Sequence, residues 1–180
     1  MILAPLSKLF RRETARQTAP CVPAGERYYV VGDIHGRLDL FEALVGAIEE
    51  DEATAPAAMA HVVLLGDLID RARKWRKKRQ VRIIAGNHEE MFLESFRDAE
   101  VLRHFLKHGG RETILSYGLS PKDYRKLTFK ELFERLPQIV PQEDRDFVAG
   151  FEDMIVAGDY VFVHAGIDPK LPLEQQRRSD

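Results

Sequence analysis

Three short apolar runs in this chain each end in a glycine, and the residue after each glycine has a side chain that can bind a metal ion. Short runs rich in β-branched residues are typical of buried strands, and glycine lets the backbone turn tightly where a strand ends. The runs are residues 28–31, 62–65 and 81–85, and the pairs that follow them are Gly32-Asp33, Gly66-Asp67 and Gly86-Asn87. Because α/β folds place ligands at the carboxyl ends of parallel strands, we expect these side chains to converge on one pocket.

A fourth apolar run, residues 160–163, ends directly in His164. Two more histidines, His35 and His88, stand close to the first and third glycines. Carboxylate and amide oxygens together with imidazole nitrogens form a mixed ligand set that suits transition metals. The sequence therefore predicts the site of a metal-dependent hydrolase.

The composition limits the protein to a few classes. At 180 residues the chain fits one domain, and 44% hydrophobic with 31% charged residues is ordinary for a globular protein. A net charge of −2 does not favour binding to nucleic acid, and the single cysteine, Cys21, excludes an intrachain disulfide. No apolar stretch approaches the roughly 20 residues that span a bilayer. The N-terminus lacks the residue order of a secretory signal, so we expect a cytoplasmic protein.

The chain is expected to consist of an extension and one domain. Residues 1–25 hold three of the nine prolines and show little periodicity, so we expect them to be poorly ordered, with the domain over residues 26–180. Strand and helix patterns alternate in the domain, which favours a parallel sheet with right-handed crossovers. An amphipathic helix is predicted from Asp39, and a hairpin is predicted between residues 154–156 and 160–164.

Residues 98–150 are predicted to be mainly helical. The first helix, over about 98–107, would end at Gly109-Gly110, because glycine commonly follows a helix C-terminus. The later helices are expected to be broken at the prolines, which are Pro121, Pro137 and Pro141.

Two histidines of the first of these helices need an interpretation. His104 and His108 lie one turn apart with Glu100 on the same side, a spacing that can bind metal. Since no further ligand is evident, we interpret them as part of a solvated helix face. A place for His108 on the rim of the pocket is the alternative.

Four motifs contain the candidate site residues. They are Gly32-Asp33-Ile34-His35-Gly36, Gly66-Asp67-Leu68-Ile69-Asp70-Arg71, Gly86-Asn87-His88-Glu89 and Phe162-Val163-His164-Ala165-Gly166. In this order, each after an expected strand, they resemble the calcineurin-like metallophosphoesterases, and among these the bacterial and phage serine/threonine protein phosphatases. The resemblance implies an α/β fold of layered β-sheets flanked by helices.

The resemblance also implies a site for two divalent metal ions. Asp33 and His35 would hold the first ion, Asp67 would bridge both, and Asn87 and His164 would hold the second. A carboxylate between two cations partly cancels their repulsion, and the two ions lower the pKa of a shared water so that hydroxide can attack phosphorus. Manganese is the expected metal, with iron, zinc, nickel and cobalt as alternatives.

Three further residues would act on the substrate if the resemblance holds. His88 would donate a proton to the leaving alkoxide, and Asp70 would hold its ring, since a carboxylate on one imidazole nitrogen fixes the tautomer. Arg71 would grip the phosphate oxygens, because its planar fork can contact two oxygens together.

Single residues of these motifs also have structural interpretations. Asp33 or Asp67 alone could cap a turn or a helix, and Asn87 could cap the helix that follows it. His164 alone could be a hydrogen-bonded core residue. The combination of the motifs favours the site.

A strongly basic stretch follows the second motif. Residues 71–79 include seven basic residues and Trp75, a composition that could contact nucleic acid. We expect instead a solvated helix with Trp75 against the core, so nucleic acid is not an expected partner.

The chain departs from the family pattern in two places. Ala72 replaces the glycine that normally follows the second motif, and only residues 71–80 separate Asp70 from the next strand, which is short for a parallel crossover. The late Gly-His motif, whose histidine completes the shell of the second metal, has no counterpart in the sixteen residues after His164. We therefore expect weaker binding of the second metal and a domain whose C-terminal part is missing.

These observations lead to one expected function and two alternatives. The expected function is two-metal hydrolysis of phosphoesters, with phosphoserine and phosphothreonine proteins as the substrates that the resemblance implies, or a small phosphoester. Hydrolysis of dinucleoside polyphosphates is the first alternative, since related enzymes use the same motifs. The second is a degenerate or truncated member that hydrolyses little and acts as a binding protein.

Overall fold

Three parallel strands form the centre of the protein. The structure, a computed structural model, describes residues 19–32, 38–57, 59–66 and 81–176. Strands β1 (Glu26–Val31), β2 (Met59–Leu64) and β3 (Val81–Ile83) form a sheet in the order β1-β2-β3. Val31 lies opposite Leu64 and Leu64 opposite Ile83, so the three strands end at nearly the same level. The expected parallel sheet is confirmed.

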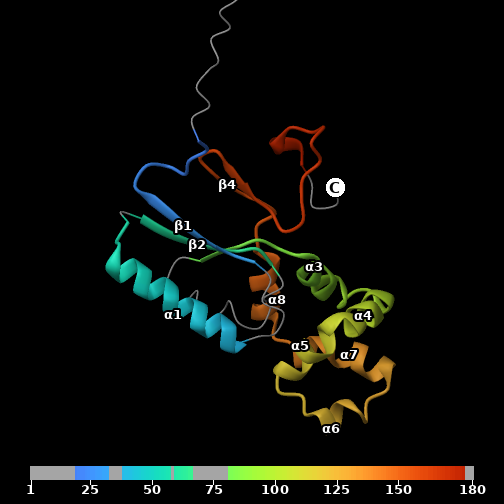
Figure 1. Ribbon diagram of the computed structural model, residues 1–180. Helices are drawn as coiled ribbons and strands as arrows, with labels where there is room; N and C mark the ends of the chain where they lie inside the picture. Colours follow the sequence, from blue (N-terminus) through green and yellow to red (C-terminus); the bar gives the residue numbers. More distant parts are fainter. Residues whose placement is uncertain (1–18, 33–37, 58, 67–80, 177–180) are drawn as a thin grey trace, which may run out of the picture.

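The sheet is covered on both faces. Val62, Val63 and Leu64 of the central strand are fully buried, as a continuous apolar run in a parallel sheet requires. Val62 and Leu64 pack with Phe41 and Ile48 of helix α1 (Leu38–Thr54), whereas Val63 packs in a separate cluster on the other face. Figure 1 shows α1 along one face of the sheet and the hairpin strand β4 above the other.

A hairpin forms the second layer. Strands β4 (Ile155–Ala157) and β5 (Tyr160–Phe162) pair antiparallel, close to the predicted hairpin. Ile155 and Phe162 pack with Val63 and so bring β4 and β5 onto the sheet. Before the hairpin, Glu152 pairs with Ile84 in a parallel bridge, which extends the sheet beyond β3.

Residues near the N-terminus bind the turn of this hairpin. The Asp159 amide donates to the Cys21 carbonyl, and the Cys21 amide donates to a carboxylate oxygen of Asp159, both at 3.0 Å. The Tyr160 hydroxyl donates to the carbonyl of Pro20. Part of the segment that we expected to be poorly ordered is therefore bonded to the domain, while residues 1–18 lie outside the described residues.

Helices occupy the space beyond the carboxyl ends of the strands (Figure 1). They are α3 (Asn87–Glu94), α4 (Ala99–Phe105), η2 (Leu106–Gly110), α5 (Arg111–Ser116), α6 (Pro121–Tyr124), α7 (Phe129–Ile139) and α8 (Gln142–Ala149), and a 3₁₀ turn, η3 (Leu173–Gln175), lies near the end. Their apolar faces bury Phe92, Leu102, Phe105, Ile114 and Leu136, which join the core of the sheet. No helix among the described residues is both long and apolar enough to cross a membrane.

Two of the three prolines break helices as predicted, and one does not. Pro121 opens α6 and Pro141 precedes α8 as its N-cap residue. Pro137 lies inside α7, so the predicted break there is wrong. It stands two residues before the helix end, where Leu132 and Leu136 bury the helix face and offset the lost backbone hydrogen bond.

Candidate active site at the carboxyl ends of the strands

Three separate segments meet just beyond β2 and β3. A methyl group on Gly66 would lie 2.6 Å from Nδ1 of His164 and 3.0 Å from the Cα and N atoms of Gly86. Gly66 also has a φ of +112°, which side chains rarely tolerate. Only glycine fits this position, which lies against the backbone of Gly86, the residue before Asn87.

His164 is held by a bond to the backbone. Its Nδ1 donates to the carbonyl oxygen of Leu65, the last residue before Gly66. A carbonyl oxygen can only accept, so Nδ1 carries the proton and the lone pair of the neutral ring is on Nε2. This is the arrangement of a histidine that binds a metal through Nε2.

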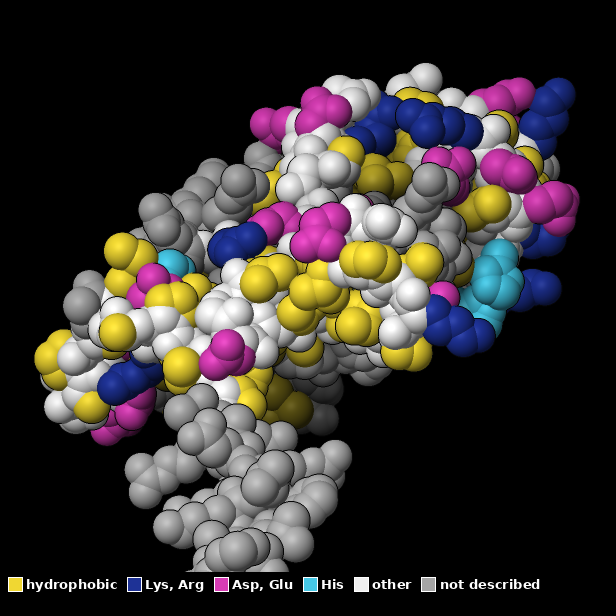
Figure 2. All heavy atoms as spheres, turned by 90° about the horizontal axis from the view of Figure 1, so that it is seen from above, with side chains coloured by type: hydrophobic (Ala, Val, Ile, Leu, Met, Phe, Trp, Pro, Cys, Tyr) yellow, Lys and Arg dark blue, Asp and Glu magenta, His cyan; other side chains and the backbone are white. Residues whose placement is uncertain are grey.

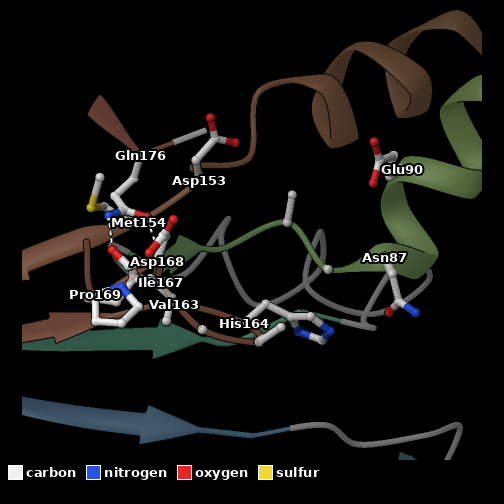
Figure 3. A pocket seen from close by; sticks show the side chains of 14 residues that line it. Asn87, Glu90, Asp153, Met154, Val163, His164, Ile167, Asp168, Pro169 and Gln176 are labelled. Atoms are coloured by element: carbon white, nitrogen blue, oxygen red, sulfur yellow. Dashed lines mark hydrogen bonds between the residues drawn. The ribbon is translucent and has the colours of Figure 1, made fainter. Parts of the chain in front are cut away.

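A pocket of about 570 Å³ opens at the meeting point. The polar side chains that line it are Asn87, Glu90, Asp153, His164, Asp168 and Gln176, and no lysine or arginine is among the described lining residues. Figure 3 shows Asn87 and His164 near one end of the pocket and Asp153, Asp168 and Gln176 on the other side. Acidic and amide oxygens with an imidazole suit a cation, so the donor set fits a metal ion and would bind an anion only with cations present.

The predicted metal ligands divide into two groups. Asn87, the exposed first residue of α3, and His164, half-buried after β5, both line the pocket, and the structure brings them together. Asp33, His35 and Asp67 lie outside the described residues, as do the predicted catalytic residues Asp70 and Arg71 and the basic stretch 71–79. Within the described ranges, no three His, Cys, Asp or Glu side chains cluster closely enough to hold a metal.

The third predicted catalytic residue, His88, lies beside a kink between two helices. A methyl group on Gly109 would lie 3.7 Å from Cε1 of His88. Gly109 has a φ of +96°, and a methyl group on Gly110 would lie 2.3 Å from the ring of Phe105. His108 and Gly109 have non-helical φ and ψ, and α5 begins just after Gly110, so a helix ends at these glycines as predicted.

One residue of the third motif has a role that the sequence did not indicate. Glu89 is fully buried, and its carboxylate accepts the amide hydrogen of Gly86 at 2.9 Å. Gly86, rather than Asn87, is therefore the N-cap of α3. The sequence signal for this capping role is a glutamate at the third helical position. The capping box, however, normally has serine or threonine as its N-cap residue, and here that residue is glycine.

The far side of the pocket comes from residues that sequence reasoning missed. The Gln176 side chain accepts from the Asp168 amide at 2.9 Å and donates to the carbonyls of Asp168 and Leu171 at 2.7 and 2.9 Å (Figure 3). These three hydrogen bonds hold the loop that contains Asp168 in a fixed turn. No local pattern could have indicated this, because the contact depends on how the loop folds back.

Asp153 directly follows Glu152, and the ion pair between Glu152 and Arg82 helps to position it. Nε of Arg82 in β3 donates to Glu152 at 2.8 Å, and a second guanidinium nitrogen bonds the other carboxylate oxygen. The hydrogen bonds that Arg82 donates to the Glu152 carboxylate raise the pKa of Arg82, so the guanidinium keeps its charge. The pair ties the chain before Asp153 to the sheet.

Two comparisons with known proteins found a match. The family model described as calcineurin-like phosphoesterase matches residues 26–179. A solved structure described as "a putative diadenosine tetraphosphatase" matches with a TM-score of 0.54 and 19% sequence identity, covering 87% of this chain and 58% of that chain. The present chain therefore spans less than two thirds of that structure. No curated protein matches the sequence significantly.

Proposed function

Since the chain belongs to the calcineurin-like phosphoesterases, a family of metal-dependent hydrolases, we propose that it hydrolyses phosphate monoesters of serine and threonine in proteins. The observation that supports this most strongly is the contact of Gly66, Gly86 and His164. Gly66 of the second motif lies close to Gly86 and His164, which line the pocket, and a site with ligands from several strands requires such an approach.

The ligand set of the proposed site follows from the motifs. Asp33 and His35 would hold one divalent ion, Asn87 and His164 the other, and Asp67 would bridge them. Manganese is the metal that we propose. Two such ions, when bound, supply a hydroxide at neutral pH and neutralise charge on the phosphoryl group.

The remaining roles belong to three side chains near these ligands. His88 would give its proton to the leaving oxygen of serine or threonine, which is a poor leaving group without one. Asp70 would orient the ring of His88, and Arg71 would hold two phosphate oxygens. A methyl group added at Gly109 would lie 3.7 Å from Cε1 of His88, so the kink lies close to the ring of the proposed proton donor.

Hydrolysis of dinucleoside polyphosphates is a second candidate. The similar solved structure is described as "a putative diadenosine tetraphosphatase", although 19% identity indicates a shared fold only. A phosphopeptide and diadenosine tetraphosphate should therefore be compared as substrates. A higher kcat/KM for the phosphopeptide supports the first function, and a higher value for the dinucleotide supports the second.

Both candidate functions require metal-dependent hydrolysis. It is tested with p-nitrophenyl phosphate as the substrate of the purified chain, with and without Mn²⁺. We expect turnover that depends on the metal and falls about 100-fold or more in Asp67→Asn and His164→Asn. His61→Asn is the matched control, because His61 pairs with Glu26 away from the pocket lining. No turnover from a folded chain would contradict the proposal and favour the degenerate member.

A further inference from the structure

Two histidine rings lie together at the kink between α4 and α5. The ring centroids of His104 and His108 are 4.2 Å apart, with 49° between the ring planes. His104 belongs to the last turn of α4, whereas His108 lies in η2 with a φ of −112° and a ψ of 37°, which are not helical values. The two rings therefore approach each other across the kink and not along one regular helix.

Both residues are exposed to solvent. Neither ring makes a hydrogen bond or an ion pair with any residue that the structure describes. Figure 2 shows histidine side chains side by side on the surface near one end of the molecule. A neutral imidazole has one nitrogen with a lone pair, so two such lone pairs are open to a ligand from solvent.

The backbone beneath the pair is held by the core. Leu102 and Phe105 bury the inner side of α4, and a methyl group on Gly110 would lie 2.3 Å from the ring of Phe105. Packing thus fixes the chain on both sides of His108. Ligands that folding has already brought together lose little conformational freedom when they bind an ion.

The separation of the rings suits two bonds to one metal ion. A bond between zinc and an imidazole nitrogen is about 2.0–2.1 Å long, so two such nitrogens on one ion lie about 3 Å apart. Rings with centroids 4.2 Å apart can reach this arrangement by rotation about their side-chain bonds. Histidines four positions apart are also the spacing at which helices bind zinc.

The pair would bind a transition metal without a carboxylate. Glu100, which has the spacing of a third ligand, lies with Oε2 3.5 Å from Nε of Arg103. Among the residues that the structure describes, no three potential ligands form a group, so water would complete the shell. Imidazole ligands suit zinc, nickel and copper, while manganese stands at the weak end of the divalent series.

The pair is separate from the pocket but close to a predicted catalytic residue. Neither His104 nor His108 is among the described residues that line the pocket. Gly109 directly follows His108, and a methyl group on it would lie 3.7 Å from Cε1 of His88. An ion on the pair would therefore hold the kink beside His88 without occupying the pocket.

We propose that His104 and His108 bind one zinc, nickel or copper ion across the kink between α4 and α5, at a site apart from the pocket. Binding stabilises the folded kink, because only the folded chain holds the two rings this close together. The proposal does not depend on phosphoester hydrolysis, and a chain without turnover would still bind the ion.

The test is calorimetric titration of Ni²⁺ into the full chain in the presence of excess Mn²⁺, which is kept to occupy the metal site proposed at the pocket. We expect Ni²⁺ to bind, and its affinity to fall about tenfold or more in His104→Asn and in His108→Asn. Ni²⁺ should also raise the midpoint of thermal unfolding of the wild type more than that of either variant. Both positions are exposed, so the substitutions should leave the fold intact.

Lys107→Gln is the matched control, because Lys107 is exposed and lies between the two histidines in the chain. It should bind Ni²⁺ at least as tightly as the wild type, since it removes a positive charge near the cation. His164→Asn, which changes the pocket, should keep the binding that His104→Asn and His108→Asn lose. Unchanged affinity in both of these histidine variants, an equal loss in Lys107→Gln, or no binding by the folded wild type would overturn the site.

Discussion

The ring of His164 is bonded through Nδ1 to the carbonyl oxygen of Leu65, a residue 99 positions earlier in the chain. This bond joins the end of β5 to the end of β2 and fixes which nitrogen of the ring faces the pocket. Gly66, directly after Leu65, makes the close approach possible. The expected effects of changing Gly66, Glu89 and Gly109 depend on close contacts of this kind.

Gly66→Ala should disrupt the meeting point of the three segments. The new methyl group would overlap the His164 ring and press on the Gly86 backbone, and its φ of +112° would be strained. We expect the free energy of unfolding to fall by about 2–4 kcal/mol, measured by urea denaturation. Gly46→Ala is the control, since nothing lies within 4 Å of it in α1, and it should leave stability unchanged or raise it.

Glu89→Ala should destabilise the start of α3. It removes the buried acceptor of the Gly86 amide and leaves a cavity, so we expect a loss of about 2–4 kcal/mol in the free energy of unfolding. Glu94→Ala, which removes an exposed partner of Arg97, should cost less than about 1 kcal/mol. Equal losses in the two variants would show that the Glu89 cap is unimportant.

Gly109→Ala should affect turnover through His88. Its φ of +96° would be strained by about 1–3 kcal/mol, and its methyl group would contact the ring of His88. Gly118→Ala has similar strain, at a φ of +92°, but nothing lies within 4 Å of it. We expect both variants to lose stability and only Gly109→Ala to lose activity. The loss should be larger with phenyl phosphate than with p-nitrophenyl phosphate, because the poorer leaving group needs the proton more. Equal activity in the two variants would argue against the contact.

The cap of α7 should make stability depend on acidic pH. Hydrogen bonds from the Thr128 backbone and hydroxyl lower the pKa of Glu131 below its ordinary value of 4.5. A lowered folded-state pKa stabilises the protein above the ordinary value, and this contribution is lost as the pH falls through the folded value. In Glu131→Gln, the free energy of unfolding should therefore change less between pH 6 and the acidic range than in the wild type. Glu134→Gln, with no such cap, should retain the wild-type pH dependence.

The sequence was sufficient to predict the sheet because each strand pattern is local. Residues 62–65 are apolar without interruption and end in glycine, and the strand is buried on both faces as such a run requires. Asn87 and His164 line one pocket, but β5 belongs to an antiparallel hairpin, so the position of His164 depends on its bond to Leu65 and not on strand order alone.

The remaining features depend on contacts that no local pattern contains. Glu89 lies in the third motif, but its role depends on the hydrogen bond that its carboxylate accepts from the Gly86 amide, which the sequence does not show. The kink at Gly109 requires the ring of Phe105 to pack against Gly110, and the loop of Asp168 requires Gln176 to fold back over it. Pro137 is tolerated because the burial of α7 outweighs one lost hydrogen bond.

The span of the Leu65–His164 bond also has a consequence for the order of folding. Contacts between residues far apart in sequence form late, because the intervening chain must first be ordered. Helices α3 to α8 lie between the two residues, so the pocket cannot close until they have packed. During synthesis, the ends of β2 and β3 would leave the ribosome well before their partner, and the polypeptide could acquire the complete pocket only after His164 had emerged.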